Sequence, residues 1–316
     1  MYQKAKKRTM YFIGVTTASS SIMKVFPKWA KYLKLGDVEI KGIDFIVHDE
    51  SEKYREAVEF IKNDELSLGA LVTTHKMDLL RVCKDQFDKL DEYAELMDEI
   101  SSISKRDGKL IGHAKDPITS GLSLDAFLPE NYWKNTRAEA FIIGAGGSGV
   151  AISWHMLKKE FGENRPSKII VANRSEGKIK KIKEIHRKIG ADIPVEYYST
   201  INNGDINQKL CEKLKPGSLV INATGLGKDA PGSPFTVDEV SFPQKGIAWD
   251  FNYRGDLIFL DQARKAKEKD DKLQIEDGWI YFIHGWTHVI AEVFDIDIPT
   301  KGPVFDELSK IAASVR

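Results

Sequence analysis

The chain has 316 residues, of which 42% are hydrophobic and 30% charged, with 47 basic and 47 acidic side chains. This length favours two domains, and a net charge of zero argues against nucleic acid or an anionic membrane surface as a partner. The two cysteines, Cys83 and Cys211, lie far apart, which argues against a disulfide framework or a zinc site. The apolar run near the amino terminus is too short for a secretory signal, so we expect a soluble, cytoplasmic protein that holds no metal.

The first part of the chain alternates strand patterns with helix patterns. Apolar and β-branched runs predict four strands, at 11–16, 38–47, 70–72 and 109–113. Apolar residues at helical spacing predict helices at 23–35 and 52–63, and an interrupted helix over 77–103. This alternation is typical of an α/β domain with a mainly parallel sheet, which we place at residues 1–125.

A glycine-rich stretch, AFIIGAGGSGVAISWHM at 140–156, follows the boundary. Gly144, Gly146 and Gly149 have the spacing G-x-G-x-x-G, between a predicted strand and a predicted helix. Such glycines allow a tight turn, a close approach of the backbone to a pyrophosphate, and close packing of helix on strand. The pattern predicts a dinucleotide site at a helix N-terminus, and the alternative is a glycine-rich turn without a ligand.

The rest of the chain continues the alternation. Four further strands are predicted at 168–172, 195–198, 219–222 and 247–250. Charged, amphipathic segments such as 177–188 and 261–269 separate them, which predicts a doubly wound, Rossmann-type domain over 126–278. The segments 279–294 and 303–315 have helical patterns, and we expect 279–316 to return to the first domain.

The residues after the second strand of this domain indicate which nucleotide is bound. An NAD enzyme carries an acid there for the ribose 2′-hydroxyl, whereas an NADP enzyme carries a cation for the 2′-phosphate. The chain has Asn173, Arg174 and Ser175 at this place, and an arginine can grip a phosphate with two hydrogen bonds. We therefore predict NADP, the alternative being a surface arginine that follows a strand.

Five short motifs, in order, resemble those of the shikimate/quinate dehydrogenase family over nearly the whole chain. They are GAGG at 144–147, NRS at 173–175, NATGLG at 222–227, DFNY at 250–253 and DG at 277–278. The resemblance implies an α/β substrate domain, a Rossmann domain and NADP as cofactor. The cofactor contacts that we predict are Gly144, Ala145, Gly146, Gly147, Ser148, Gly149, Asn173, Arg174, Ser175, Asn222, Ala223 and Thr224.

The resemblance also implies a catalytic pair, Lys76 and Asp116. VTTHK at 72–76 stands where the family has Asn-Val-Thr-x-Pro-x-Lys, and Ala114-Lys115-Asp116 stands where it has Asn-Thr-Asp. The chemistry needs such a pair, because oxidation of an alcohol sends a hydride to the nicotinamide and a proton to an acid–base group. Burial would lower the pKa of the lysine, and the aspartate would oppose that shift.

Substrate contacts are expected from the serine cluster after the first strand and from two other family positions. The resemblance implies Ser19 and Ser21, with Thr73 and Tyr253 facing the substrate. The serines could instead form a turn or cap a helix, and the tyrosine could be a half-buried core residue.

Several positions depart from the family pattern. Ala114 replaces an asparagine that would contact the ring, and the glycine after the aspartate is displaced to Gly121. The closing segment lacks the family's glutamine and has His284, Gly285, Trp286 and His288 in that region. His75, His284, His288 or Ser20 could replace the missing contacts, or the histidines could be solvated or structural.

The sequence therefore favours an NADP-dependent oxidoreductase that interconverts a ring alcohol and its ketone. The expected substrate is shikimate or a closely related hydroxylated cyclic carboxylate. Alternatives are quinate, aminoshikimate or another small substrate, or an NADP-binding sensor with weak catalysis. We expect a monomer or homodimer without nucleic acid or membrane partners.

Overall fold

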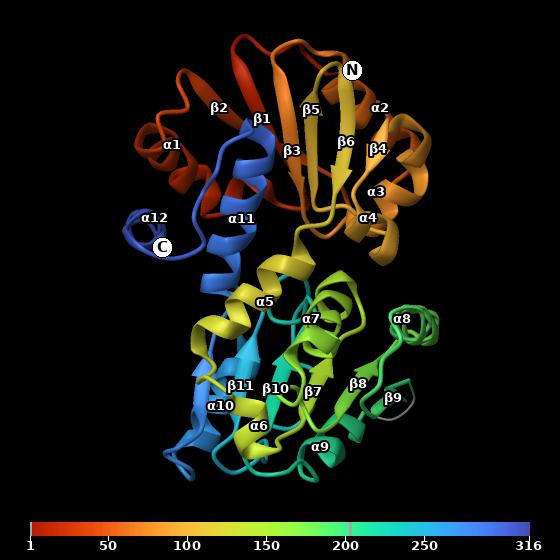
Figure 1. Cartoon of the computed structure of the whole chain (residues 1–316), viewed down its shortest axis with the longest axis vertical. Coiled ribbons are helices and arrows are strands. Elements are labelled where there is room, and N and C mark those ends of the chain that lie inside the picture. Colours follow the sequence, from red (N-terminus) through yellow and green to blue (C-terminus); the bar gives the residue numbers. More distant parts are fainter. Residues whose placement is uncertain (1, 202–203) are drawn as a thin grey trace. The chain divides into compact units, whose positions relative to one another are not determined.

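The computed structural model describes residues 2–201 and 204–316 (Figure 1). The chain divides into two compact units, Met1–Thr119 with Ile283–Arg316, and Ser120–Phe282. Each unit contains one six-stranded sheet. No helix among the described residues is both long and apolar enough to cross a membrane.

The sheet of the first unit has the strand order β2-β1-β3-β5-β6-β4. Its strands are β1 (Arg8–Gly14), β2 (Val38–Asp44), β3 (Ser67–Val72), β4 (Lys89–Leu90), β5 (Ser102–Arg106) and β6 (Lys109–His113). β1 is parallel to β2 and β3, and β4 is parallel to β6. β5 is antiparallel to both of its neighbours, so the sheet is mixed.

The prediction of one interrupted helix over 77–103 is wrong in its second half. The segment forms α3 (Lys76–Cys83), β4 and α4 (Glu92–Met97), and its last two residues are the first two of β5. β5 and β6 form a hairpin whose turn, Asp107-Gly108, has positive φ angles of 51° and 73°. Asp-Gly is a common sequence for the turn of a hairpin, and here it joins the antiparallel pair β5 and β6.

Helices on the first unit's sheet bury its core. α2 (Ser51–Asn63) and α3 cover the β1–β3 region, where Ile13, Tyr54 and Leu79 are among the buried residues. α1 (Ile22–Tyr32) packs against α12 (Pro303–Ala313), and the Trp29 indole donates a hydrogen bond of 2.8 Å to the carbonyl oxygen of Leu308. The carboxyl-terminal residues therefore complete this unit.

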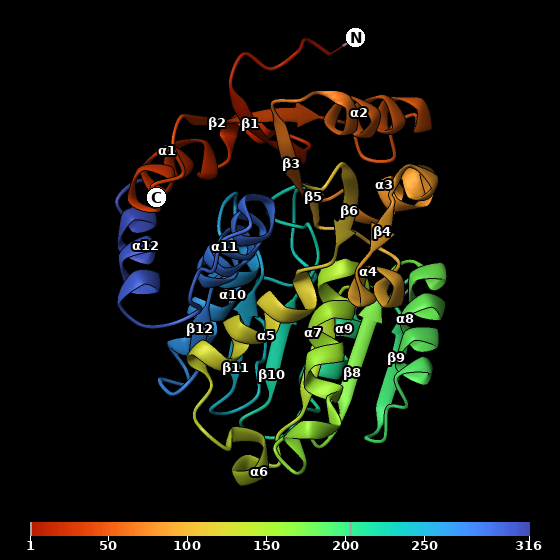
Figure 2. The ribbon, with the colours of Figure 1, turned by 45° about the horizontal axis from the view of Figure 1, so that its top comes forward.

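The sheet of the second unit is parallel throughout, in the order β12-β11-β10-β7-β8-β9 (Figure 2). Its strands are β7 (Ala140–Ile143), β8 (Ile169–Asn173), β9 (Val195–Ser199), β10 (Leu219–Asn222), β11 (Ile247–Asp250) and β12 (Gln274–Glu276). From β7, the strands β8 and β9 are added on one side, and β10, β11 and β12 are added on the other. Doubly wound folds bind ligands at this change in strand order, here between β7 and β10. The predicted Rossmann-type fold is confirmed.

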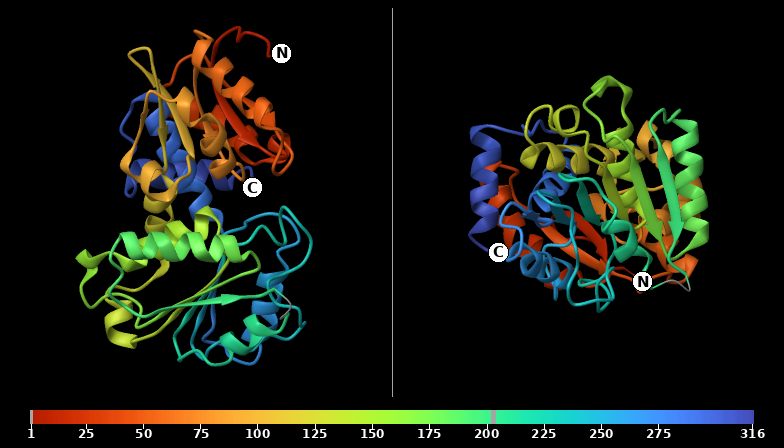
Figure 3. Two further views of the ribbon diagram at one scale, coloured as in Figure 1. Left: turned by 90° about the vertical axis from the view of Figure 1, so that its right-hand side faces the viewer. Right: turned by 90° about the horizontal axis from the view of Figure 1, so that it is seen from below.

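Helices cover both faces of this second sheet (Figure 3). They are α6 (Tyr132–Thr136), α7 (Gly147–Leu157), α8 (Glu176–Lys188), α9 (Ile206–Cys211) and α10 (Ile258–Lys267). Two further helices contain residues of both units, α5 (Asp116–Phe127) and α11 (Trp279–Phe294). The short elements β12, α6 and α9 were not predicted.

Candidate functional site

The glycine turn joins β7 to α7. Gly144 has a φ of 119°, and a Cβ atom there would lie 2.6 Å from the carbonyl oxygen of Ala223. A Cβ atom on Gly149 would lie 2.1 Å from the carbonyl oxygen of Gly144, so both positions exclude a side chain. A Cβ atom on Gly146 would meet no described atom within 4 Å. Packing therefore explains two glycines, and the third leaves room for a ligand that approaches the backbone.

The start of α7 supplies hydrogen-bond donors to this space. The N-cap residue Gly146 offers no side-chain acceptor, and the first turn contains no acidic residue. The first N–H groups of the helix, which include those of Gly147 and Ser148, have no acceptor inside the helix. Together with the positive end of the helix dipole, they fit the pyrophosphate of a dinucleotide.

The predicted NADP clamp lies at the end of β8. The Asn173 side-chain oxygen accepts a hydrogen bond of 3.1 Å from the Ala145 N–H, which ties the strand end to the turn. The Ser175 hydroxyl accepts a hydrogen bond from the Lys178 N–H and so caps α8. Arg174 is exposed and has no ion-pair partner in the part of the chain that the structure describes. Its guanidinium is thus available for an anion such as a 2′-phosphate.

The end of β10 lies against the turn and carries a buried polar network. The Asn222 side-chain oxygen accepts hydrogen bonds of 3.1 and 2.6 Å from the N–H and hydroxyl of Thr224. The Asn222 amide donates to Asp250 at 3.1 Å. Burial raises the pKa of Asp250 to about 7, although hydrogen bonds from Asn252 and Asn222 oppose the shift. The ends of β7, β8 and β10 thus place the predicted cofactor residues together.

The first unit brings Lys76 and Asp116 together. Lys76 is the first residue of α3 and Asp116 the first of α5. Their side chains form an ion pair and are only 16% and 8% exposed. Burial lowers the pKa of Lys76, but the carboxylates of Asp116 and Glu99 outweigh burial and hold this pKa above its ordinary value. The lysine is therefore kept as an ammonium ion.

Glu99 is a third charged residue of this cluster, and reasoning from the sequence missed it. Its side chain is buried, and the next residue, Ile100, donates its N–H to the carbonyl oxygen of Lys76 at 3.2 Å. That bond fixes the loop before β5 against the start of α3. The segment was predicted as a helix, and its residue pattern contains no signal for a buried acid.

The predicted substrate residues of the first unit follow β1 and β3. Ser19 is exposed, and its hydroxyl donates to the Thr16 carbonyl oxygen at 2.9 Å. Ser21 is half-buried at the N-cap of α1, but its side chain makes no capping hydrogen bond. Thr73 is half-buried, and its N–H donates to the Ile13 carbonyl oxygen at 3.0 Å, which fixes the loop that leads to Lys76.

Tyr253 belongs to the second unit. It is half-buried, and its ring centroid lies 5.3 Å from that of Trp279 and 4.7 Å from that of Phe282. It therefore forms part of an aromatic cluster, as the alternative interpretation of this residue expected.

The histidines that could replace missing contacts are mostly buried. His75 is fully buried and its Nδ1 lies 2.9 Å from the Tyr54 hydroxyl, which makes it a core residue. His284 is 3% exposed and stacks on Phe305, and burial together with His288 lowers its pKa to about 4. Among the described residues, no cluster of three or more His, Cys, Asp or Glu side chains could hold a metal ion.

The substitutions around Asp116 have structural consequences. Ala114 is fully buried in the hydrophobic core of the unit. The Lys115 ammonium lies 2.6 Å from a carboxylate oxygen of Glu292 on α11, and both side chains are about one-seventh exposed, at 14% and 15%. The same glutamate lies 2.9 Å from Arg106. This ion-pair cluster ties the segment before Asp116 to β5 and α11.

Curated proteins with similar sequences are shikimate dehydrogenases, although no protein-family model matches the chain. The enzyme of Nitrosopumilus maritimus, named shikimate dehydrogenase (NADP(+)), is 25% identical over 218 residues, which are 68% of this chain and 69% of the relative. The enzyme of the same name from Caldicellulosiruptor bescii is 24% identical over 260 residues, 81% of this chain and 79% of the relative.

Solved structures share the fold over almost the whole chain. Shikimate dehydrogenase of Aquifex aeolicus has a TM-score of 0.70 at 18% identity, covering 99% of both chains. Shikimate 5-dehydrogenase of Thermus thermophilus, in complex with NADP(H) and shikimate, has a TM-score of 0.66 at 17% identity, covering 98% of this chain and 99% of that one. The 5-ketofructose reductase of a Gluconobacter strain has a TM-score of 0.64 at 16% identity, covering 98% and 99%.

Proposed function

We propose that this chain, a shikimate dehydrogenase-like protein by its motifs, relatives and fold, is an NADP-dependent oxidoreductase. It would interconvert a ring secondary alcohol and its ketone, in shikimate or a closely related hydroxylated cyclic carboxylate. The observation that carries the proposal is the buried pair of Lys76 and Asp116, in a chain whose other unit has the glycine turn of a dinucleotide site. The names of the curated relatives support both the reaction and the cofactor.

Lys76 would act as the acid–base group. In ketone reduction its ammonium donates a proton to the carbonyl oxygen as this oxygen becomes an alcohol, and in oxidation the neutral amine accepts the hydroxyl proton. NADP supplies hydride chemistry when bound. Asp116 holds the ammonium in place, and Glu99 adds a second negative charge that raises the pKa of the same lysine. A lysine so held stays protonated at neutral pH, which is the form that reduction of the ketone requires.

The cofactor would bind along the second sheet's carboxyl edge. The first N–H groups of α7 would hold the pyrophosphate above Gly146, and the exposed Arg174 would hold the 2′-phosphate. Ser175 would add a hydroxyl beside it, and the amides of Asn173 and Asn222 keep the strand ends in position. This arrangement predicts preference for NADP over NAD.

Substrate recognition is where a second candidate has support. Ser19, Ser21, Thr73 and Tyr253 would contact the substrate, but the family's ring-binding asparagine is replaced by the core residue Ala114. Without this amide, the substrate loses one hydrogen-bond partner, and its binding free energy becomes less favourable by about the contribution of one hydrogen bond unless another group replaces it. The fold is shared with a 5-ketofructose reductase, so the same reaction on another small polyhydroxy carbonyl compound is the second candidate.

A turnover assay on the full chain tests both candidates. Oxidation is assayed by mixing purified protein with NADP and shikimate, quinate or aminoshikimate, and reduction by mixing it with NADPH and 5-ketofructose. Both reactions are followed by the absorbance of the reduced nicotinamide. We expect turnover of at least one substrate, abolished in Lys76→Met and Asp116→Asn and retained in Lys84→Met, an exposed lysine of the same unit. NADP binding without turnover on any substrate would reject the enzyme proposal in favour of a nucleotide-binding sensor.

The proposal also includes the cytoplasm as the place of action and a monomer or homodimer as the working form. Both cysteines, Cys83 and Cys211, are free and buried, which supports a reducing compartment. Size-exclusion chromatography with light scattering tests the oligomeric state, and a tetramer would contradict this part of the proposal.

A further inference from the structure

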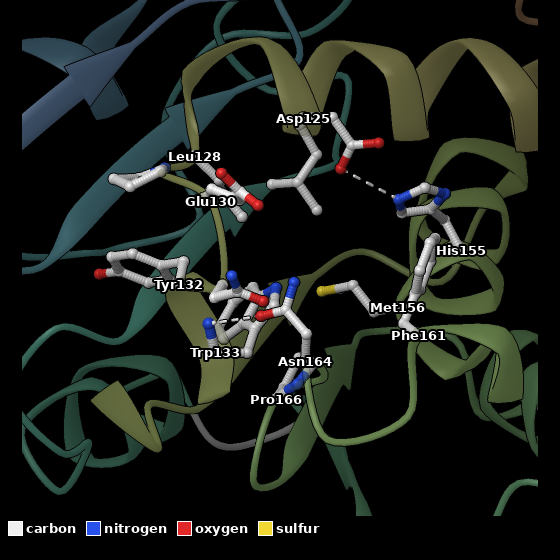
Figure 4. Close-up of a pocket in the computed structure, with 13 residues that line it drawn as sticks. Asp125, Leu128, Glu130, Tyr132, Trp133, His155, Met156, Phe161, Asn164 and Pro166 are labelled. Atoms are coloured by element: carbon white, nitrogen blue, oxygen red, sulfur yellow. Dashed lines mark hydrogen bonds and ion pairs between the residues drawn. The ribbon is translucent and has the colours of Figure 1, made fainter. Parts of the chain in front are cut away.

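A cavity of about 320 Å³ lies in the second unit, at the end of α7 far from the nucleotide turn (Figure 4). Residues of α5, α6, the last turn of α7 and the following loop line it. Its volume is at the lower end of the range for small-molecule sites, about 300–1,000 Å³. None of the predicted cofactor or substrate residues lines it, so it is separate from the proposed active site.

The floor of the cavity is apolar and aromatic. Leu124, Met156 and Trp133 line it and are 1%, 2% and 5% exposed. The Asn164 side-chain oxygen, which also faces the cavity, already accepts a hydrogen bond of 3.1 Å from the backbone N–H of Trp133. An occupant of this space therefore needs an apolar or aromatic body that packs on the floor.

The charged groups at the cavity are almost all negative. Asp125 and Glu130 lie along the same side of it, and no lysine or arginine is among the lining residues that the structure describes. Glu130 is exposed and has no ion-pair partner within the described residues. Carboxylates accept hydrogen bonds and attract cations, so the polar end of an occupant should be a donor with a positive charge.

His155 is the one basic side chain of the lining, and it is held in place by tight packing. A Cβ atom on Gly121 would lie 2.1 Å from its Nδ1, so only glycine at this place lets the imidazole lie against α5. Its Nε2 lies 3.4 Å from a carboxylate oxygen of Asp125, and its ring centroid lies 5.0 Å from that of Phe161. The displaced glycine that distinguishes this chain from the family pattern thus builds one wall of the cavity.

We propose that this cavity is a binding site for a small organic cation, a primary amine on an aromatic or aliphatic body. The ammonium would lie against Asp125 and Glu130, and the body would pack on Trp133 and Met156. The site is independent of the proposed oxidoreductase reaction, because it shares no residue with that site.

The test is calorimetric titration of the full chain with phenethylamine, and with 2-phenylethanol as a neutral probe of the same shape. We expect the amine to bind about tenfold more tightly than the alcohol, since it adds a charge-assisted hydrogen bond. The double variant Asp125→Asn, Glu130→Gln should lose about tenfold in affinity for the amine and keep its affinity for the alcohol. The control is Glu163→Gln, which removes an exposed acid paired with Lys134 that does not line the cavity.

Three outcomes would overturn the proposal. Equal affinity for amine and alcohol would show that the site does not select a cation. An equal loss in Glu163→Gln would show a general effect of charge. Circular dichroism checks that the wild-type protein and the variants are folded alike. If folded wild-type protein gives no binding heat with millimolar phenethylamine, the cavity is not a site for this class of ligand.

Discussion

The two units carry their functional residues in different ways. The nucleotide site of the second unit consists mainly of backbone, because two glycines are required by packing and the donors are main-chain N–H groups at the start of α7. The site of the first unit consists of charges: Lys76 pairs with Asp116, and the buried Glu99 also acts on it electrostatically. A site built from backbone depends on local spacing, whereas a site built from charges depends on which distant side chains burial brings together.

The largest effect is expected at the charged site. Lys76→Met removes the acid–base group, and kcat should fall by about 10²–10⁴-fold, the usual worth of such a group. NADP affinity should stay within about twofold, because this residue has no part in the proposed nucleotide site. Steady-state kinetics and a fluorescence titration with NADP measure the two quantities. A variant that keeps more than a tenth of wild-type kcat would contradict the role of Lys76.

The backbone site is tested by two glycines that differ in their surroundings. Gly149→Ala places a Cβ atom against the Gly144 carbonyl oxygen and should lower the free energy of unfolding by about 2 kcal/mol. Gly146→Ala meets no described atom and should change stability by less than about 1 kcal/mol, while weakening NADP binding about tenfold. Urea unfolding and NADP titration separate the two effects. Equal stability losses with unchanged NADP binding would show that the space above Gly146 holds no phosphate.

The exposed cation at the end of β8 should decide nucleotide choice. Arg174→Ala should weaken NADP binding about tenfold or more, the worth of a hydrogen bond to a charged group, and leave NAD binding unchanged. Lys178→Ala, an exposed residue of α8, serves as the matched control. Equal losses for NADP and NAD in the Arg174 variant would contradict a contact with the 2′-phosphate.

Glu99→Gln should give the smallest change, a shift along the pH axis. Removing this carboxylate takes away a charge that raises the pKa of Lys76, so this pKa should fall. Ketone reduction needs the ammonium form, and its rate declines as pH rises through that pKa; the decline should therefore begin at lower pH. Glu95→Gln, an exposed acid of α4, should leave the profile unchanged. An unmoved profile in the Glu99 variant would show that this carboxylate does not act on Lys76.

Most of the second unit could be predicted, because its strands are short, apolar and followed by marked turns. Gly144 and Asn173 also identified the strand ends that meet at the nucleotide site, since parallel strands place their carboxyl ends at one edge. The first unit was predicted less completely. β6 was predicted, but its hairpin with β5 was missed because a helical pattern was assigned up to residue 103, over the start of β5, although Asp107-Gly108 is a turn signal.

The candidate site, too, was predicted only in part. Lys76 and Asp116 were predicted from family order, and the structure places them in contact. The two opposing effects expected on the pKa of Lys76 are both present, burial lowering it and Asp116 raising it; Glu99 adds a second raising charge, and the net shift is upward. The position of Glu99 depends on a hydrogen bond between residues 76 and 100 that no local pattern encodes.

The buried carboxyl at the end of β11 makes unfolding a proton-releasing event. The pKa of Asp250 is about 7 in the folded chain against an ordinary 3.8, so between these values the native protein keeps a proton that the denatured chain gives up. The contribution of this group to stability is therefore highest in acid and declines as pH rises toward 7. Urea midpoints measured at pH 5 and pH 7 should reveal this decline, and Asp250→Asn should reduce it. Through this one group, a rise in pH toward 7 lowers the stability of the unit at the strand ends on which the nucleotide would lie.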